Sequence, residues 1–332
     1  MQRIGRGAFR MDNACIIGSA AVVGRKEGEG PLGLQFDKVL DDDTFGTDSW
    51  EKAESALIES AVDICLKKCN LKDSDPDVVF TGDLLNQCVA STFGLREKNI
   101  PQIGMYGACS TMATTLINAA VFADCCVAGV SLASTSSHFS ASQRQFRTPL
   151  TYGGQRTPTA QWTVTGAGAA AVGREGAVKI TAAQIGTMVD MGVSDPANMG
   201  AAMAPAAAQT IEQMLTNTGM NPGDFHMILT GDLGAVGSEL LLQLLEKEKI
   251  VIKKEHRDCG MLIYDNQKQD THAGGSGCGC AASVLCGSII PAIERGEVGR
   301  VLFVATGALM STTSAQQGES IPGIAHAVIL EK

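Results

Sequence analysis

The clearest pattern along the chain is a short, mostly apolar run that ends in a turn and occurs twice. Residues 77–80 precede Thr81-Gly82-Asp83-Leu84, and residues 226–229 precede Thr230-Gly231-Asp232-Leu233. Asp83 and Asp232 are 149 positions apart, close to half of the 332-residue chain. Each copy reads as a buried strand with a Gly-Asp turn, followed by a helix pattern at residues 84–97 and 236–249. The sequence therefore predicts an α/β fold with two similar lobes from an internal duplication.

Other apolar patterns extend this plan on both sides of a boundary near residues 174–178. A helix is predicted over residues 50–68, with Asp48 or Ser49 as its cap. Pro205 predicts the start of another helix, because proline is tolerated in a first turn. Further helices are predicted over residues 112–124, 205–217 and 280–295, and strands over residues 100–106, 300–305 and 325–330. We divide the chain into an N-terminal half, residues 1–175 with a loop insertion at about 135–160, and a C-terminal half, residues 176–332.

Composition narrows the class of protein and its surroundings. Hydrophobic residues make up 45% of the chain and charged residues 18%, which is enough apolar material for a sizeable core. The net charge of −9 at pH 7 argues against a general affinity for nucleic acid. Eleven cysteines without a secretory signal indicate reduced thiols in a cytoplasm. Asn118 and Asp124 interrupt the longest apolar run, so we expect a soluble chain that reaches a membrane only through a partner.

Two local motifs resemble those of the thiolase superfamily. Gly107-Ala108-Cys109-Ser110-Thr111 lies between a strand pattern and an apolar helix pattern, like the nucleophile elbow of thiolases and ketoacyl synthases. Asn198-Met199-Gly200, followed by Pro205 and Ala208, is similar to a second thiolase stretch. This resemblance implies a thiolase-like fold with layers in the order α/β/α/β/α. It also implies a homodimer, the usual state of proteins with this fold.

A longer series of motifs, in order from about residue 17 to residue 331, resembles the stage V sporulation protein AD family. The motifs are Gly30-Pro31-Leu32-Gly33, Thr81 to Gln87, Gly107 to Thr111, Thr135-Ser136-Ser137-His138, Arg144-Gln145-Phe146-Arg147, Tyr152-Gly153-Gly154-Gln155, Asp258-Cys259-Gly260, Gly274 to Cys278 and Ala305 to Leu309. The resemblance implies a protein that binds dipicolinic acid (pyridine-2,6-dicarboxylate), free or as its calcium chelate, for uptake into the spore. It also implies a peripheral place at the spore inner membrane, with the other stage V protein A subunits as partners and no cofactor.

Cys109 is the candidate nucleophile if the chain is instead an acyltransferase of the thiolase or ketoacyl synthase type. A cysteine at a helix N-terminus has a lowered pKa, which favours acylation. Thiolases, however, place Gly-His-Pro before a helix of the second half, and the matching stretch from Gly274 to Cys278 has no histidine. Their late Cys-x-Gly-Gly-Gly loop is also replaced, by residues 321–326. We therefore predict a binding protein rather than an enzyme, with His138 and His326 as alternative bases.

Charge and resemblance together select the candidate ligand-binding residues. Residues 125–174 contain no Asp or Glu but include several Arg. Arginine pairs with carboxylates through planar donors, so Arg144, Arg147 or Arg156 is expected to face a dicarboxylate or a channel partner. Pairing with the other lobe or another subunit is the alternative. The predicted ligand site consists of Asp83, Cys109, His138, Arg144, Arg147 and His326.

Asp83 and Asp232 occupy matching turns but receive different assignments. Asp83 shares its half with Cys109 and is assigned to the site, where it would hold calcium only with further oxygen ligands. Asp232 is interpreted as structural, because an Asp after a strand often accepts hydrogen bonds from nearby backbone amides. No metal site is predicted, since the spacing of Cys259, His272, Cys278 and Cys280 is not that of a zinc ribbon or finger.

Overall fold

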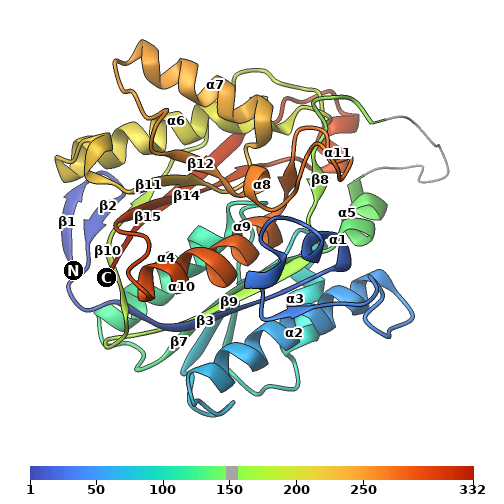
Figure 1. The fold of residues 1–332 in the computed structure, drawn as a ribbon, viewed down its shortest axis with the longest axis vertical. Helices are drawn as coiled ribbons and strands as arrows, with labels where there is room; N and C mark the ends of the chain where they lie inside the picture. Colours follow the sequence, from blue (N-terminus) through green and yellow to red (C-terminus); the bar gives the residue numbers. More distant parts are fainter. Residues whose placement is uncertain (147–155) are drawn as a thin grey trace.

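The computed structural model describes residues 1–146 and 156–332 and arranges them in five layers, with helices outside and between two sets of strands (Figure 1). The outer helices are α2 (Trp50–Lys68) and α3 (Val89–Leu95) on one side, and α6 (Met199–Thr218) and α7 (Gly234–Lys247) on the other. The central helices are α4 (Thr111–Asp124), α9 (Cys278–Val284) and α10 (Ile290–Glu294). Helix α4 packs on strands of both sets. This order confirms the predicted α/β/α/β/α fold.

Each half contributes five strands in the same order and with the same directions. In the N-terminal half the order is β3 (Cys15–Val23), β9 (Gly166–Gly173), β7 (Ser131–Ser137), β5 (Val78–Gly82) and β6 (Gln102–Gly104). In the C-terminal half it is β10 (Val178–Ile185), β15 (Gly323–Glu331), β14 (Val301–Ala308), β11 (Met227–Thr230) and β12 (His256–Asp258). In chain order, both sets read first, fifth, fourth, second, third. The repeated topology confirms the duplication that the two Thr-Gly-Asp-Leu motifs predicted.

The two sets of strands meet along a short seam between β10 and β3. Only Val178↔Ile16 and Lys179↔Cys15 are paired there, in antiparallel register. A hairpin of β1 (Gln2–Gly5) and β2 (Ala8–Arg10) is added to the other end of β10. Short elements complete the chain: α1 (Arg25–Gly28), β4 (Lys38–Val39), α5 (Phe139–Phe146), β8 (Trp162–Thr163), α8 (Cys259–Leu262), β13 (Gly275–Ser276) and α11 (Thr312–Gln316).

Helix α2 confirms the predicted range, and Ser49 is its cap. The Ser49 hydroxyl accepts a hydrogen bond from the backbone N–H of Lys52 at 3.3 Å, which satisfies one free donor of the first turn. The buried face of the helix repeats at helical spacing through Leu57, Ile58 and Ala61. An isolated helix of this length is marginal in water, so burial of this face stabilises it.

The predicted start of α6 at Pro205 is wrong, because the helix begins six residues earlier, at Met199. Its first turn packs closely on α7: an added Cβ at Gly200 would lie 2.6 Å from the Leu233 carbonyl oxygen and 2.9 Å from the Gly237 nitrogen. This helix–helix contact extends the helix N-terminally past the residue that local propensity favours as its start. Tertiary packing thus places Pro205 inside a helix, where it removes one backbone hydrogen bond.

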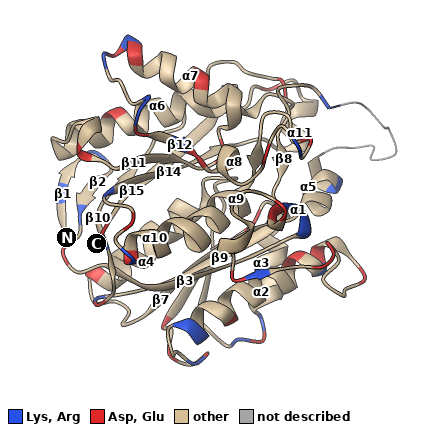
Figure 2. Cartoon of the chain, in the orientation of Figure 1, with Lys and Arg blue, Asp and Glu red and all other residues tan. Residues whose placement is uncertain are grey.

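Small residues let the layers approach closely. Strand β9 consists of Gly, Ala and Val, and all eight of its residues are buried. At Gly168 an added Cβ would lie 2.4 Å from the carbonyl oxygen of Ala282 on α9. Charged residues lie mainly on the outer helices and in loops (Figure 2). Among the described residues, the buried acidic ones are Glu27, Glu54, Asp83, Asp124, Asp232 and Asp258.

Candidate functional site

Cys109 lies in a strained turn between β6 and α4. Ala108, directly before it, has a φ of 50°, in the left-handed region that residues with a Cβ rarely adopt. The turn packs against β14 at Gly307, where an added Cβ would lie 2.5 Å from the carbonyl oxygen of Gly107 and 3.0 Å from the nitrogen of Ser110. Only glycine permits this approach. The turn thereby holds Cys109, which is 7% exposed, at a fixed depth.

A pocket of about 390 Å³ opens above Cys109 and is lined by both halves of the chain. One turn of α5 contributes Ser142, Gln143 and Phe146. Met199, the first residue of α6, lies in the wall that the other half contributes. The polar residues of the lining are Tyr106, Cys109, Ser142, Gln143, Gln161, Thr163, Asp195 and Ser276. A pocket of this size, mostly apolar with a few polar groups, is typical of sites for small organic ligands.

The thiol of Cys109 is held beside a carboxylate rather than an imidazole. The neighbouring carboxylate belongs to Asp232, which follows β11 in the other half. Burial, and then the negative charge of Asp232, raises the pKa of the thiol well above its ordinary value. These two effects are larger than the effect of the helix N-terminus, which was expected to lower the pKa of the thiol. The thiol is therefore protonated, and a weak nucleophile, at neutral pH.

Asp232 is fully buried, and its carboxylate accepts hydrogen bonds from distant parts of the chain. Oδ1 accepts from the hydroxyl of Thr306 on β14 at 2.8 Å, and Oδ2 from the N–H of Gly277 at 2.9 Å. Gly277 has a φ of 104°, so glycine is needed to aim this N–H. Burial raises the pKa of Asp232 to about 7, although these donors and the Cys109 thiol oppose the shift.

Asp232 was interpreted as structural, but its hydrogen-bond partners are not the local ones that we expected. We expected its oxygens to accept from nearby backbone amides, but Asp258 has that role in this half. Asp258 accepts from the N–H of Leu233 at 2.9 Å and of Gly234 at 3.0 Å. Asp232 is thereby left to face Cys109. The Thr-Gly-Asp-Leu motif is the same in both halves and does not predict the position of Asp232 beside Cys109, because the partners Gly277 and Thr306 are distant in sequence.

Asp83 is buried and bound locally, and it is not among the residues that line the pocket. Its Oδ1 accepts from the N–H of Leu85 at 2.8 Å, and Oδ2 accepts from the N–H and the hydroxyl of Ser91, at 2.8 and 2.7 Å. These bonds hold an irregular segment in which Gln87 and Cys88 are both left-handed. The helix predicted over residues 84–97 is consequently shortened to α3, which begins at Val89.

All five histidines lie in the described part of the chain, and none lines the pocket. His138 accepts from the N–H of Ala141 through Nδ1, so Nε2 donates to the carbonyl oxygen of Asp43 at 2.7 Å. His326, on β15, accepts from the N–H of Gly186 at 3.2 Å. Burial lowers the pKa of both, that of His326 to about 4. Both imidazoles are therefore neutral and engaged away from Cys109.

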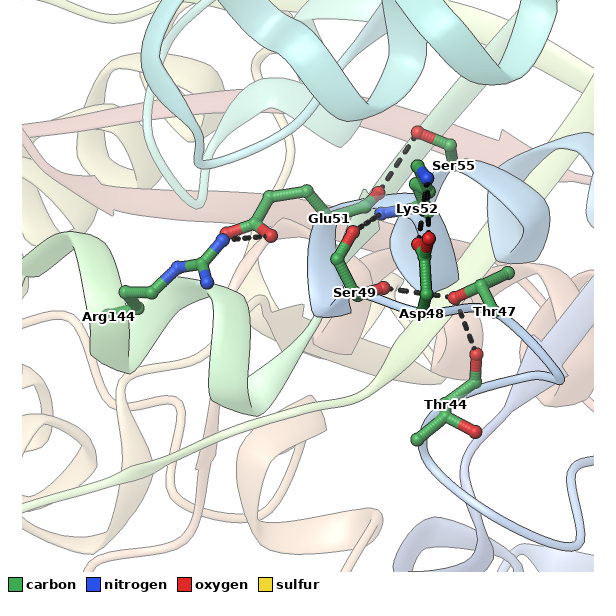
Figure 3. Close-up of polar contacts among 8 residues, drawn as sticks. All are labelled: Thr44, Thr47, Asp48, Ser49, Glu51, Lys52, Ser55 and Arg144. Carbon is green, nitrogen blue, oxygen red and sulfur yellow. Dashed lines mark hydrogen bonds and ion pairs between the residues drawn. The ribbon is translucent and has the colours of Figure 1, made fainter.

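Arg144 points from α5 toward the first turn of α2, where it forms an ion pair with Glu51 (Figure 3). Its guanidinium also lies 5.5 Å from the centre of the Trp50 ring. It lines a separate shallow groove, whereas its neighbours Gln143 and Phe146 face the Cys109 pocket. Arg147 lies outside the described residues.

Arg156 is likewise engaged away from the pocket, by a strained loop of the other half. It donates to the carbonyl oxygen of Asp270 at 2.7 Å and to its carboxylate at 2.9 Å. Asp270 and His272 both have positive φ, and His272 bonds to the carbonyl oxygen of Thr157 at 2.9 Å. This is the interlobe pairing that we weighed as the alternative for the arginines.

The described residues contain neither a cluster of metal-ligating side chains nor a helix that could span a membrane. Within residues 1–146 and 156–332, no group of three or more His, Cys, Asp or Glu side chains is placed to hold a metal ion. In the same residues, no helix combines the length and the apolar character needed to cross a bilayer. The pocket residues Gln161 and Thr163 were missed from the sequence, because they belong to a connection and a short strand without a recognisable motif.

Two solved structures share the fold of this chain. The chain superposes on 3-oxoacyl-[acyl-carrier-protein] synthase III from Aquifex aeolicus VF5 with a TM-score of 0.57 and 15% identity, covering 96% of this chain and 100% of that one. It superposes on a single-residue variant of Xanthomonas campestris OleA with cerulenin with a TM-score of 0.62 and 11% identity, covering 99% of each chain. At these identities the likeness shows the thiolase-like fold alone.

Sequence comparison is more specific. The family model described as stage V sporulation protein AD matches residues 5–331. Stage V sporulation protein AD from Bacillus subtilis (strain 168) is 43% identical over 334 residues, covering 100% of this chain and 98% of the relative. The match to the family model and to this relative extends over both halves and the whole lining of the pocket. The chain therefore belongs to the stage V sporulation protein AD family, and its role lies in sporulation.

Proposed function

We propose that the chain binds dipicolinate, free or as its calcium chelate, in the pocket above Cys109, and that it serves dipicolinate uptake in the spore channel complex. The observation that carries this proposal is the pocket itself. It has a volume of about 390 Å³, is lined by both halves, and is present in a member of a sporulation family. Hydroxyl donors from Ser142, Thr163 and Ser276 line its wall. Such donors suit ligand carboxylates without requiring charged partners.

Binding without turnover is supported by the surroundings of the thiol. Acyl transfer from cysteine requires a thiolate, and an adjacent base or cation normally provides it. Cys109 instead faces Asp232, whose charge opposes thiolate formation, and no histidine lines the pocket. We infer that the fold keeps the position of a nucleophile and uses it as an uncharged part of the pocket floor.

The proposed partners are the other stage V protein A subunits at the spore inner membrane, and a second copy of this chain in a homodimer. The net charge of −9 supports attachment to that membrane through such subunits rather than through anionic lipid.

Isothermal titration of the purified chain with dipicolinate tests the ligand and the pocket together. We expect micromolar or tighter binding, lost when Ala197, in the pocket wall, is replaced by Trp. Thr92→Trp, in the separate groove beside α3, is the matched control and should bind as the wild type does. Equal loss in both variants, or no binding by the folded wild type, would reject the proposal.

Intact-mass measurement after incubation with acyl-coenzyme A tests the acyltransferase alternative. We expect no acyl adduct on Cys109, because its thiol is protonated. An adduct that disappears in Cys109→Ser, together with coenzyme A release, would favour the enzyme instead.

A further inference from the structure

The Cys109 pocket has an unusual charge for a site that is proposed to hold an anion. Among the described residues of its lining there is no Lys or Arg, and the one ionisable carboxyl at its wall is Asp195. Asp232 lies behind the thiol, on the inner side of the floor. Among the described residues, an entering carboxylate therefore meets negative side chains and neutral dipoles. Moving it from water into this pocket requires that some charge be offset.

Asp232 is a buried acid next to the pocket floor, and its negative charge is poorly compensated. It is 0% exposed, and within the described chain it forms no ion pair. Every element packed against it presents a neutral donor or another acid: Cys109 before α4, Thr306 on β14, Gly277 before α9, and Asp258 at the end of β12. The thiols of Cys278, Cys280 and Cys259 also feel its charge and are themselves neutral, since burial raises their pKa values. A buried carboxylate without a cation is thus poised to accept a proton.

We propose that Asp232 takes up one proton from solvent when an anionic ligand enters the Cys109 pocket, so that binding and protonation favour each other. This inference rests on the proposed function, since it concerns the same pocket. One O–H bond forms and no bond between heavy atoms changes: a carboxylate and a solvent proton become a carboxyl group. It keeps its hydrogen bond from the N–H of Gly277 and can donate to the oxygen of Thr306. Burial already raises the pKa of Asp232 to about 7, and a nearby anion raises it further.

Because ligand binding is coupled to protonation of Asp232, the affinity for the ligand depends on pH in a defined way. Below the free-state pKa of Asp232 the proton is already present, and affinity is independent of this group. Above it, each pH unit weakens binding by up to about tenfold, because a proton must be acquired with the ligand. The carboxyl groups of dipicolinate are ionised throughout this range, so the ligand contributes no proton of its own.

Titration calorimetry from pH 6 to pH 9 measures this coupling directly. Free dipicolinate is used with a calcium chelator, so that chelated Ca²⁺ does not supply the offsetting charge. Comparison of phosphate with Tris, which differ in ionisation enthalpy, counts the protons. We expect uptake to approach one proton near pH 8, and Asp232→Asn to abolish both the uptake and the pH slope. Glu297→Gln, an exposed acid that pairs with Arg295 on the surface, is the control and should behave as the wild type. Binding by the wild type without proton uptake overturns the proposal.

A second measurement needs no ligand and therefore separates this inference from the proposed function. The infrared band of a protonated carboxyl, taken as wild type minus Asp232→Asn, should disappear with a midpoint near pH 7. Glu27, another fully buried acid with a pKa raised by burial to about 7, contacts Tyr264 and Thr165 instead and cancels in the difference. If the band persists up to pH 9, Asp232 is already protonated before any ligand enters and the proposal fails, whatever the ligand is.

Discussion

The two copies of Thr-Gly-Asp-Leu lie at equivalent places in the two halves and have different uses. In the N-terminal half Asp83 binds Leu85 and Ser91, a few residues away. In the C-terminal half Asp232 binds Thr306 and Gly277, from other elements, and faces Cys109. Both carboxyls are buried, and burial raises both pKa values. The difference shows that duplication preserved the backbone position while the hydrogen-bond partners diverged.

This divergence was possible because a second acid took over the local role. Asp258 binds the backbone N–H groups of Leu233 and Gly234 and the hydroxyl of Thr230, at 2.6 Å. A buried turn needs an acceptor for its free amides. Once Asp258 satisfies them, the aspartate of the motif is free to contact the pocket floor. The comparison therefore separates an aspartate that stabilises the fold from one that shapes a site.

The largest expected effect is on stability. Asp83→Ala leaves two buried backbone donors without an acceptor and leaves the Ser91 hydroxyl with the Cys88 carbonyl oxygen alone, so we expect the free energy of unfolding to fall by about 3 kcal/mol. Urea unfolding at pH 8 measures it. At the same pH Asp232→Asn should cost less than about 1 kcal/mol, because it also removes a buried charge without a cation. Equal losses of stability in the two variants would contradict the different roles assigned to Asp83 and Asp232.

A smaller effect, about tenfold, is expected on the reactivity of Cys109. Asp232→Asn removes the negative charge that opposes thiolate formation, so alkylation by iodoacetamide should become faster at pH 8. Peptide mapping follows Cys109, with the exposed Cys125 and Cys126 as internal references. If Asp232 were instead the base that activates a catalytic thiol, the same substitution would slow the reaction, so the sign of the change distinguishes the two roles.

The smallest effect is expected at Arg144. Its guanidinium is bound to Glu51 and lies over Trp50, so Arg144→Gln should change dipicolinate affinity by less than about twofold. Titration calorimetry measures this affinity, and Ala197→Trp, which blocks the pocket, shows how large a full loss of binding is. A tenfold loss would return Arg144 to the ligand site, as the charge pattern of residues 125–174 first indicated.

Features set by local sequence were predicted well, and features set by distant contacts were not. The range of α2 followed from its apolar period, and the two lobes from a repeated motif. Cys109 was found because the elbow is a local pattern. The start of α6 was missed because contact between Gly200 and Gly237 decides it. The different partners of Asp83 and Asp232 were not predicted, because one motif has two sets of partners and only the second set comes from across the fold.

Gly307, which is not a lining residue, sets the depth of the pocket floor. The hydrogen on its Cα faces the backbone of the Cys109 turn, with the oxygen of Gly107 where a methyl group would go. The depth of the thiol is thus fixed by contact between two main chains. A change as small as Gly307→Ala would push the turn outward and make the cavity shallower, without replacing any side chain that lines it.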